Sequence, residues 1–409
     1  MDEPGAMIVV GAGLTGGRAA EALRQQGYAG RVVLVGEEPE RPYERPPLSK
    51  ELLRGEKRSS EFFLRSEPYY AEQRIELRLN TRVERIDAQA HRALLSGGSV
   101  LSYDRLLIAT GCTVRRLRVP GTELRGLHYL RTLRDADAIA SALAARPNVL
   151  VVGAGFIGCE VAASARMLGC HVTMIDVATP LAAVIGERLG QWIASMHRAH
   201  GVDVRVGVGV AAFHGTERVE TALLDNGEEV PCGLVVIGVG VMPNIPAVEG
   251  ATLDVQDGIV VDERCRTSIA DLYAAGDVAS WPHPVWGERL RVEHFDHAQN
   301  HGVWAAKCML GETKPYAPVP FFWSDQYDRS IQYVGYAPRW NDLVLRASPE
   351  SGSFSAFYLM DGRLQACFAV NRFKDISAAR RLLRTRSTID PELLADESVD
   401  LKKLLVEPA

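Results

Sequence analysis

The sequence predicts an α/β protein in which two glycine-rich βαβ units are followed by a smaller α+β domain. Residues 7–37 and 148–176 repeat one order of features: an apolar strand, a glycine-rich turn, a helix and a second strand. After the proline-containing stretch KPYAPVPFF, runs such as SFSAFYLMDG and RLQACFAV have the character of strands. With 409 residues, the chain is long enough for about two or three domains.

Composition and charge narrow the class of protein. The chain is 47% hydrophobic and 24% charged, and its net charge of −5 is not that of a general nucleic-acid binder. The start, MDEPGAMIVV, lacks the basic segment and long apolar run of a secretory signal, and no uncharged apolar stretch is long enough to span a bilayer. The seven cysteines are scattered and form no C-x-x-C pair. We therefore expect reduced thiols, a cytoplasmic location and no membrane partner.

The first unit has each feature of a dinucleotide-binding turn. Its apolar strand runs into Gly11, Gly13 and Gly16, which provide a tight turn, a close approach for a pyrophosphate and close helix packing. The helix predicted over about 14–26 directs unpaired N–H groups and its positive dipole end at the phosphates. Glu37 follows the second strand and lies 21 residues past Gly16. A carboxylate at this distance accepts hydrogen bonds from ribose hydroxyls.

The second unit repeats this pattern with Gly153, Gly155 and Gly158, and its second strand ends at Asp176. That carboxylate favours NADH over NADPH because it would repel a 2′-phosphate, and the next two residues offer no Arg or Lys. Two Rossmann-like units in one chain predict two dinucleotides, FAD at the first and NADH at the second.

Three more segments agree with a chain that passes between two such units. DRLLIATG and LVVIGVGVMPN are apolar strands that run into small-residue turns, at residues 104–111 and 234–244. TSIADLYAAGD ends at Gly276 and Asp277, and an aspartate there can accept hydrogen bonds from a sugar-alcohol chain beside a pyrophosphate.

The order of these segments resembles the two-dinucleotide-binding-domain flavoproteins, whose fold is glutathione-reductase-like. Within them, RPYERPPLSK at 41–50 resembles the FAD-dependent ferredoxin reductases of bacterial oxygenase systems, as do FFWSDQYD, NRFKDISAARRLL and the tail LKKLL. The resemblance implies an enzyme that passes electrons from NADH through FAD to a [2Fe–2S] ferredoxin. It also implies a FAD-binding domain at 5–113 and 241–317, an NADH-binding domain at 114–240 and a C-terminal domain at 318–409.

The resemblance also assigns site residues, with Lys50 and Glu293 as the candidate catalytic pair. On the FAD side they are Gly11, Gly13, Leu14, Thr15, Gly16, Glu37, Arg45, Lys50, Val83, Ala109, Thr110, Gly111, Arg131, Gly276, Asp277, Val278 and Trp323. On the NADH side they are Gly153, Gly155, Phe156, Ile157, Gly158, Glu160, Asp176, Gly240 and Glu293.

The segment 41–50 contains no sulfur, which bears on where the electrons go. A thiol–disulfide route needs a cysteine near the flavin, and the nearest candidate, Cys112, is interpreted as a small residue in a tight loop. A cation at Lys50 suits either a diffusible two-electron acceptor or single-electron transfer to an iron–sulfur protein, because it stabilises an anionic reduced flavin. Glu293 is a possible partner for Lys50.

Two alternatives remain open. The form V-E-H-x-D-H-A at 292–298 resembles apoptosis-inducing-factor proteins and monodehydroascorbate reductases, so a redox-sensing flavoprotein or a small-molecule or quinone reductase is also considered.

His294, His297 and His301 lie three and four residues apart, so they can share one face of a helix. This spacing is interpreted as helix packing rather than a metal site. The basic C-terminal residues, among them Arg380 and Arg381, form either a solvated face or a docking patch for an acidic ferredoxin. The protein is expected to be a monomer or a homodimer.

Overall fold

The computed structural model describes residues 6–386 and 388–404, so residues 5, 387 and 405–409 of the predicted domains and tail lie outside it. The chain folds into two compact units, each described by itself below. Unit 1 contains the residues up to Glu44, Phe62–Thr113 and Met242–Phe321. Unit 2 contains Arg45–Glu61, Val114–Val241 and the residues from Phe322 onward.

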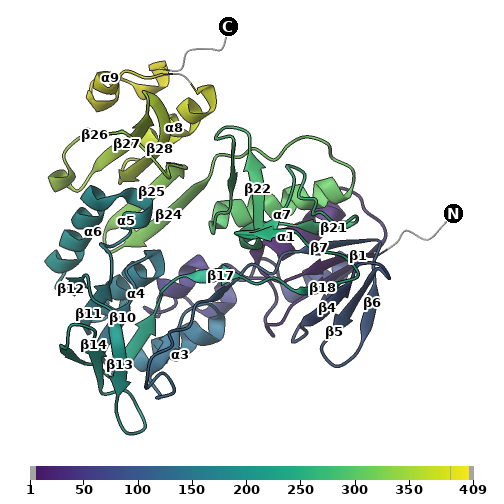
Figure 1. Cartoon of the computed structure of the whole chain (residues 1–409), viewed down its shortest axis with the longest axis horizontal. Coiled ribbons are helices and arrows are strands. Elements are labelled where there is room, and N and C mark those ends of the chain that lie inside the picture. Colours follow the sequence, from purple (N-terminus) through teal and green to yellow (C-terminus); the bar gives the residue numbers. More distant parts are fainter. Residues whose placement is uncertain (1–5, 387, 405–409) are drawn as a thin grey trace. The chain divides into compact units, whose positions relative to one another are not determined.

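Unit 1 is built on a parallel sheet of five strands in the order β21-β7-β1-β2-β3 (Figure 1). These strands are β1 (Ala6–Val10), β2 (Arg31–Val35), β3 (Ile75–Arg78), β7 (Arg105–Ile108) and β21 (Leu272–Ala274). All four residues from Met7 to Val10 are at most 5% exposed. Because side chains of a strand alternate between faces, both faces of β1 are covered, as is usual in parallel sheets.

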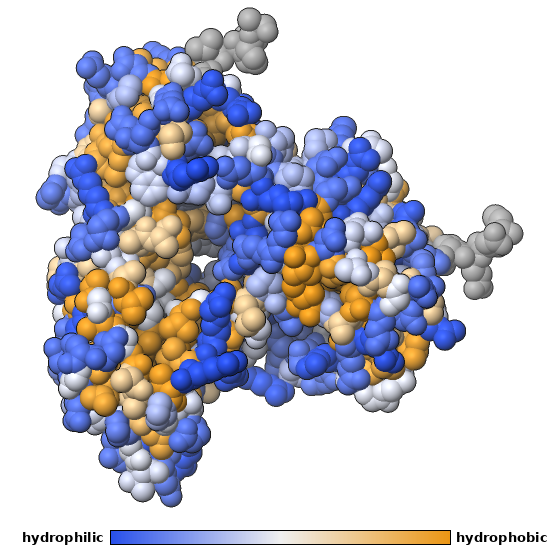
Figure 2. Space-filling model, in the orientation of Figure 1, coloured by the Kyte–Doolittle hydropathy of each residue, from blue (hydrophilic) through white to orange (hydrophobic). Residues whose placement is uncertain are grey.

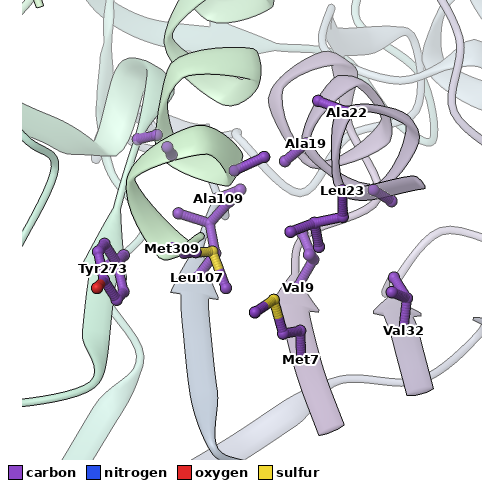
Figure 3. Close-up of a cluster of buried hydrophobic side chains, with 14 of the residues drawn as sticks. Met7, Val9, Ala19, Ala22, Leu23, Val32, Leu107, Ala109, Tyr273 and Met309 are labelled. Atoms are coloured by element: carbon purple, nitrogen blue, oxygen red, sulfur yellow. The ribbon is translucent and has the colours of Figure 1, made fainter. Parts of the chain in front are cut away.

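Helices α1 (Leu14–Gln25) and α7 (Phe295–Met309) pack on one face of this sheet. Figure 3 shows Met7 and Val9 of β1 in one cluster with Leu23 of α1 and Met309 of α7. The two helices approach closely at Gly302, where a β-carbon would overlap the carbonyl oxygen of Thr15. The core of unit 1 thus holds the glycine-rich end of α1 in a fixed place beside α7.

Smaller elements complete unit 1. A sheet of order β18-β4-β5-β6 contains β18 (Ala247–Glu249), β4 (Val83–Asp87), β5 (Arg92–Leu95) and β6 (Val100–Ser102). Another, of order β19-β20-β22-β23, contains β19 (Val255–Gln256), β20 (Gly258–Val260), β22 (Ala279–His283) and β23 (Glu288–Leu290). Helix α2 (Glu67–Glu72) precedes β3.

Unit 2 contains a second five-stranded parallel sheet, of order β12-β11-β10-β16-β9. Its strands are β9 (Leu127–Tyr129), β10 (Asn148–Val152), β11 (His171–Asp176), β12 (Asp203–Val206) and β16 (Leu234–Ile237). The helices of this part are α3 (Leu133–Leu143), α4 (Phe156–Met167), α5 (Ala182–Ile185) and α6 (Glu187–Ala199). A three-stranded sheet adds β13 (Val210–His214), β14 (Thr221–Leu224) and β15 (Glu229–Pro231).

The C-terminal part of unit 2 is a five-stranded sheet of order β24-β25-β28-β27-β26. Its strands are β24 (Phe321–Gln326), β25 (Arg329–Gly335), β26 (Asp342–Arg346), β27 (Phe354–Met360) and β28 (Arg363–Val370), followed by α8 (Phe373–Thr385) and α9 (Pro391–Ala395). In this sheet, β25 pairs with β28, β28 with β27, and β27 with β26, and all three pairs are antiparallel. Two parallel βαβ sheets and an antiparallel sheet with helices confirm the predicted fold class.

The surface of each unit is mixed in character. In Figure 2, hydrophilic residues cover much of the visible face, and smaller hydrophobic areas lie between them. Within residues 6–386 and 388–404, the structure contains no helix that has both the length and the hydropathy needed to cross a bilayer.

Candidate active site

The glycine-rich turn of unit 1 has a separate steric reason for each glycine. Gly11 has a φ of +110°, and a β-carbon there would overlap the carbonyl oxygen of Ala109. A β-carbon on Gly16 would overlap the carbonyl oxygen of Gly11. At Gly13, by contrast, a β-carbon would meet no described atom within 4 Å. The turn therefore packs tightly against the sheet at two glycines and leaves open space at the third.

The helix that follows this turn offers its N–H groups to that space. Gly13 is the N-cap of α1, and among the described residues no side chain caps the helix and no acidic residue lies in its first turn. The first N–H groups of a helix have no partner within the helix, and its dipole is positive at this end. The open side of Gly13 is therefore suited to a pyrophosphate.

The carboxyl ends of β7 and β21 bring further predicted residues to the same edge of the sheet. Ala109, Thr110 and Gly111 directly follow β7, and the Thr110 hydroxyl donates to the carbonyl oxygen of Asn244 at 2.6 Å. Gly276, which follows β21 after one residue, has a φ of +76°, and a β-carbon there would overlap the hydroxyl of Thr15. The predicted residues Asp277 and Val278 continue from Gly276 in a short 3-10 helix, where Val278 is fully buried.

Three other predicted residues also belong to unit 1. Glu37 is exposed two residues past β2. Leu14 packs against Leu64 and Ala298. Val83, the first residue of β4, is buried in the neighbouring sheet.

Glu293 precedes α7 and has an ion-pair partner within unit 1. Its carboxylate lies 2.6 Å from Nη1 of Arg291, whose Nε in turn contacts Asp257 at 2.8 Å. These carboxylates raise the pKa of Arg291, although burial alone acts in the opposite direction. Cys112 is buried, and its thiol lies 3.6 Å from the carbonyl oxygen of Asp277.

The turn of unit 2 repeats the geometry of the first. Gly153 has a φ of +100°, and its β-carbon would overlap the carbonyl oxygen of Gly238. A β-carbon on Gly158 would overlap the carbonyl oxygen of Gly153, and Gly155 faces open space. Gly155 is the N-cap of α4, which likewise has no side-chain cap and no acidic first turn among the described residues.

Several NADH-side residues surround this turn. Phe156 contacts Phe322 edge-to-face, with ring centroids 4.6 Å apart, and Ile157 is 43% exposed. Gly240 has a φ of +95° and accepts a hydrogen bond from the N–H of Arg115 at 3.0 Å. Asp176 ends β11, and its two carboxylate oxygens accept from the N–H groups of Ala154 and Ala178 at 2.6 and 3.0 Å.

A buried ion pair in unit 2 joins segment 41–50 to helix α4. Nζ of Lys50 lies 3.1 Å from Oε1 of Glu160, and both side chains are about 95% buried. Lys50 belongs to the cysteine-free segment 41–50, and Glu160 belongs to α4, the helix that follows the second glycine-rich turn. The structure thus gives the candidate catalytic residues separate partners, Glu160 for Lys50 and Arg291 for Glu293.

Two serine hydroxyls also donate to the Glu160 carboxylate. Ser49 donates to Oε2, and Ser324 of β24 donates to Oε1 at 2.7 Å. Sequence reasoning missed Ser324 and its neighbour Gln326, both fully buried. The signal was present, because both share the strand face of the apolar Phe322, where a polar side chain needs a buried partner.

Arg45, Arg131 and Trp323, predicted for the flavin side, also lie in unit 2. A guanidinium nitrogen of Arg45 donates to the carbonyl oxygen of Arg131. Arg131 precedes α3, whose first turn is fixed by a capping box between Thr132 and Asp135. Trp323 is half-buried on the face of β24 opposite to Ser324.

The predicted histidine helix is α7, and its buried histidines pack against aromatic rings. His297 stacks on Trp281 with ring centroids 4.3 Å apart, and His301 stacks on Tyr316 at 4.5 Å. Nδ1 of His301 accepts from the N–H of Gly276 at 3.1 Å. Burial lowers the pKa of His301 to about 3. These contacts show that His297 and His301 pack α7 against neighbouring aromatic rings and the turn at Gly276.

The two turns fit the two cofactors that the family resemblance implies. Each has an open glycine, a helix N-terminus without a side-chain cap, and a carboxylate at or just past the end of the second strand. These are features that a dinucleotide pyrophosphate and ribose require.

Comparison with known proteins places this arrangement among characterised families. A profile of the family described as pyridine nucleotide-disulphide oxidoreductase matches residues 5–302. A profile described as reductase C-terminal matches residues 321–405.

Similar proteins match over nearly the whole chain. The ferredoxin–NAD(+) reductase component of the anthranilate 1,2-dioxygenase system from Burkholderia cepacia is 41% identical, covering 97% of this chain and 98% of that protein. Rhodocoxin reductase from Rhodococcus erythropolis is 37% identical, covering 97% of this chain and 93% of that protein. Among solved structures, the covalent putidaredoxin reductase–putidaredoxin complex matches with a TM-score of 0.95 and 34% identity, covering 98% of both chains.

Proposed function

Because the chain belongs to the pyridine nucleotide-disulphide oxidoreductase family, we propose that it is an FAD-dependent NADH:ferredoxin reductase that serves an oxygenase. The cofactors are FAD and NAD(H). Bound FAD would supply the redox chemistry, as the acceptor of hydride from NADH and the donor of single electrons. Its full-length relatives include a reductase component of a dioxygenase system, which supports this acceptor.

The observation that carries the proposal is that Lys50, in a segment without cysteine, forms a buried ion pair with Glu160. A disulfide reductase needs a redox thiol next to the flavin, and segment 41–50 has none. Cys112 is buried and contacts a backbone carbonyl, which fits a packing role. Segment 41–50 therefore offers the ammonium group of Lys50, paired with Glu160, and no thiol.

The chain's own residues bind the two cofactors, orient them and supply charge. The N-termini of α1 and α4 bind the two pyrophosphates, and Asp176 selects the ribose of NADH. Lys50 presents a buried ammonium that stabilises negative charge on its neighbours, because burial reduces screening by water. Glu293 and Arg291 form the corresponding charged pair in unit 1.

The finer features of the partner and location belong to the same proposal. The acceptor is a [2Fe–2S] ferredoxin, and the enzyme acts in the cytoplasm as a monomer or homodimer. The seven cysteines are all free and buried, which suits a reducing compartment.

The test is reduction of cytochrome c by the purified yellow protein with NADH, with and without a [2Fe–2S] ferredoxin. We expect ferredoxin to accelerate the reaction many-fold and NADPH to replace NADH poorly. If NADH bleaches the flavin but ferredoxin adds nothing, the proposed acceptor is wrong.

A second candidate is a reductase of a small diffusible acceptor, such as a quinone or an ascorbate-like radical. The observation in its favour is His294 at the N-cap of α7, within the V-E-H-x-D-H-A form. In the same assay, such an enzyme would reduce benzoquinone rapidly and show no stimulation by ferredoxin.

A further inference from the structure

A chain of buried hydrogen bonds runs from Glu160 through β24 to α6, all within unit 2. Ser324 donates to Glu160 at 2.7 Å, and the amide nitrogen of Gln326 donates to the Ser324 hydroxyl at 3.0 Å. The amide oxygen of Gln326 lies 3.0 Å from Nε2 of His197, and Nδ1 of His197 lies 2.9 Å from the Tyr327 hydroxyl. Ser324, Gln326 and His197 are each fully buried.

The charge on Glu160 fixes the direction of every bond in this chain. The carboxylate paired with Lys50 accepts the single proton of the Ser324 hydroxyl, so that oxygen must accept from an N–H of Gln326. The Gln326 carbonyl then faces His197, which must carry its proton on Nε2. Nδ1 is left as an acceptor, and the Tyr327 hydroxyl donates to it. Each donor therefore points toward Glu160.

The state of His197 agrees with this direction. Burial lowers the pKa of His197 to about 4, so the ring is neutral at physiological pH and one nitrogen remains free to accept. A neutral imidazole with its proton on Nε2 is the only form that serves Gln326 and Tyr327 together.

We propose that Ser324, Gln326 and His197 are positioning residues that hold the Glu160 carboxylate against Lys50 and thereby set the charge that Lys50 presents to the bound flavin and NADH. None of the three needs to touch a cofactor for this role. The inference rests on the proposed function, because it assumes that Lys50 acts beside the flavin. It gives a function to the polar residues Ser324 and Gln326 of FFWSDQYD, which connect the C-terminal sheet to Glu160 by hydrogen bonds.

The test compares Ser324→Ala with Ser355→Ala in the FAD-loaded protein. Ser355 is a matched control: it is equally buried and also donates one hydrogen bond to a carboxylate, but to Asp375 at 2.8 Å rather than to Glu160. Two quantities are measured: the anaerobic stopped-flow rate of flavin reduction by NADH, and the visible absorption spectrum of the bound, oxidised flavin. We expect Ser324→Ala to slow reduction about tenfold, as loss of one charge-assisted hydrogen bond implies, and to shift the spectrum. Ser355→Ala should change neither.

A second pair of variants tests the far end of the chain. His197→Leu removes the donor to Gln326, and His197→Gln restores an N–H near the position of Nε2. We expect His197→Leu to slow reduction several-fold and His197→Gln to recover most of the wild-type rate, at similar melting temperatures.

The outcomes separate this inference from the proposed function. If Ser324→Ala and Ser355→Ala behave alike, or if His197→Gln is as slow as His197→Leu, the positioning role is refuted while wild-type ferredoxin reduction still stands. If NADH does not reduce the flavin of the wild-type protein at all, the proposed function itself fails.

Discussion

At the residue scale, two glycines of one turn are expected to fail in different ways when each becomes alanine. A β-carbon at Gly16 would overlap a backbone carbonyl, so Gly16→Ala should destabilise the apoprotein by about 2–4 kcal/mol through backbone displacement. A β-carbon at Gly13 meets open space, so Gly13→Ala should leave the apoprotein stable and weaken FAD binding at least tenfold. Urea unfolding of the apoprotein and FAD titration measure the two effects. Equal loss of stability in both variants would contradict this steric account.

Asp176 is the residue expected to select the nicotinamide cofactor. Its carboxylate is held by two backbone N–H groups, and the neighbouring Val177 is 72% exposed, which leaves room for a longer side chain. We expect Asp176→Ser with Val177→Arg to lower kcat/KM for NADH about tenfold and to raise kcat/KM for NADPH by a similar factor. The initial rate of flavin reduction at varied NADH and NADPH gives both values. Val177→Arg alone, which keeps the carboxylate, serves as the control and should gain little with NADPH.

At the element scale, α8 carries the basic face that the sequence offered as a docking patch. Lys374, Arg381 and Arg384 are exposed on or near this helix, and Phe373 beside them is 58% exposed. Arg372, by contrast, is engaged with Asp375 at 2.6 Å and Glu397 at 3.0 Å. The exposed set is therefore the better candidate for contact with an acidic ferredoxin.

Charge reversal tests this face. Arg381→Glu with Arg384→Glu should raise the apparent KM for ferredoxin about tenfold at low salt, with a smaller effect at high salt, because steering by exposed charges is screened. Flavin reduction by NADH should remain unchanged. Arg58→Glu with Arg82→Glu, two exposed arginines elsewhere on the surface, is the matched control. An unchanged KM in the α8 variant would remove this helix as a docking site.

Some features of this fold could be predicted from the sequence, and others could not. Both glycine turns were predictable because their spacing is local, and β27 and β28 were expected from SFSAFYLMDG and RLQACFAV. The partner of Lys50 was not predictable from spacing, because Glu160 lies 110 positions away and is brought there by the packing of α4. The same holds for Gln326 and His197, which are separated by 129 positions. Local patterns indicate turns and strands, whereas the choice of a buried charge partner depends on tertiary contacts.

At the scale of the whole molecule, both units bury histidines that must stay neutral. Burial lowers the pKa of His301 to about 3 and that of His197 to about 4, and it also lowers the pKa of His297. His297 faces His301, His294, His283 and Tyr316, and His197 faces Gln326, Tyr327 and His200. These neighbours add no negative charge next to the rings, so protonation in the folded state is opposed in both units.

The stability of the protein should therefore fall as the pH is lowered from about 6.5. Unfolded histidines bind protons near pH 6.5, whereas His301 and His197 bind them only near pH 3–4, so the unfolded state holds more protons throughout that window. Each such histidine should lower the free energy of unfolding by about 1.4 kcal/mol per pH unit below 6.5, and its full contribution is present only above that pH. The measurement is urea unfolding at pH 7, 6 and 5, with tryptophan fluorescence as the signal. Replacing one such ring by a residue that does not titrate, as in His197→Gln, should make the pH dependence shallower by about one proton. A wild-type stability that is constant between pH 7 and 5, or an unchanged slope in His197→Gln, would show that these rings already bind protons in the folded protein.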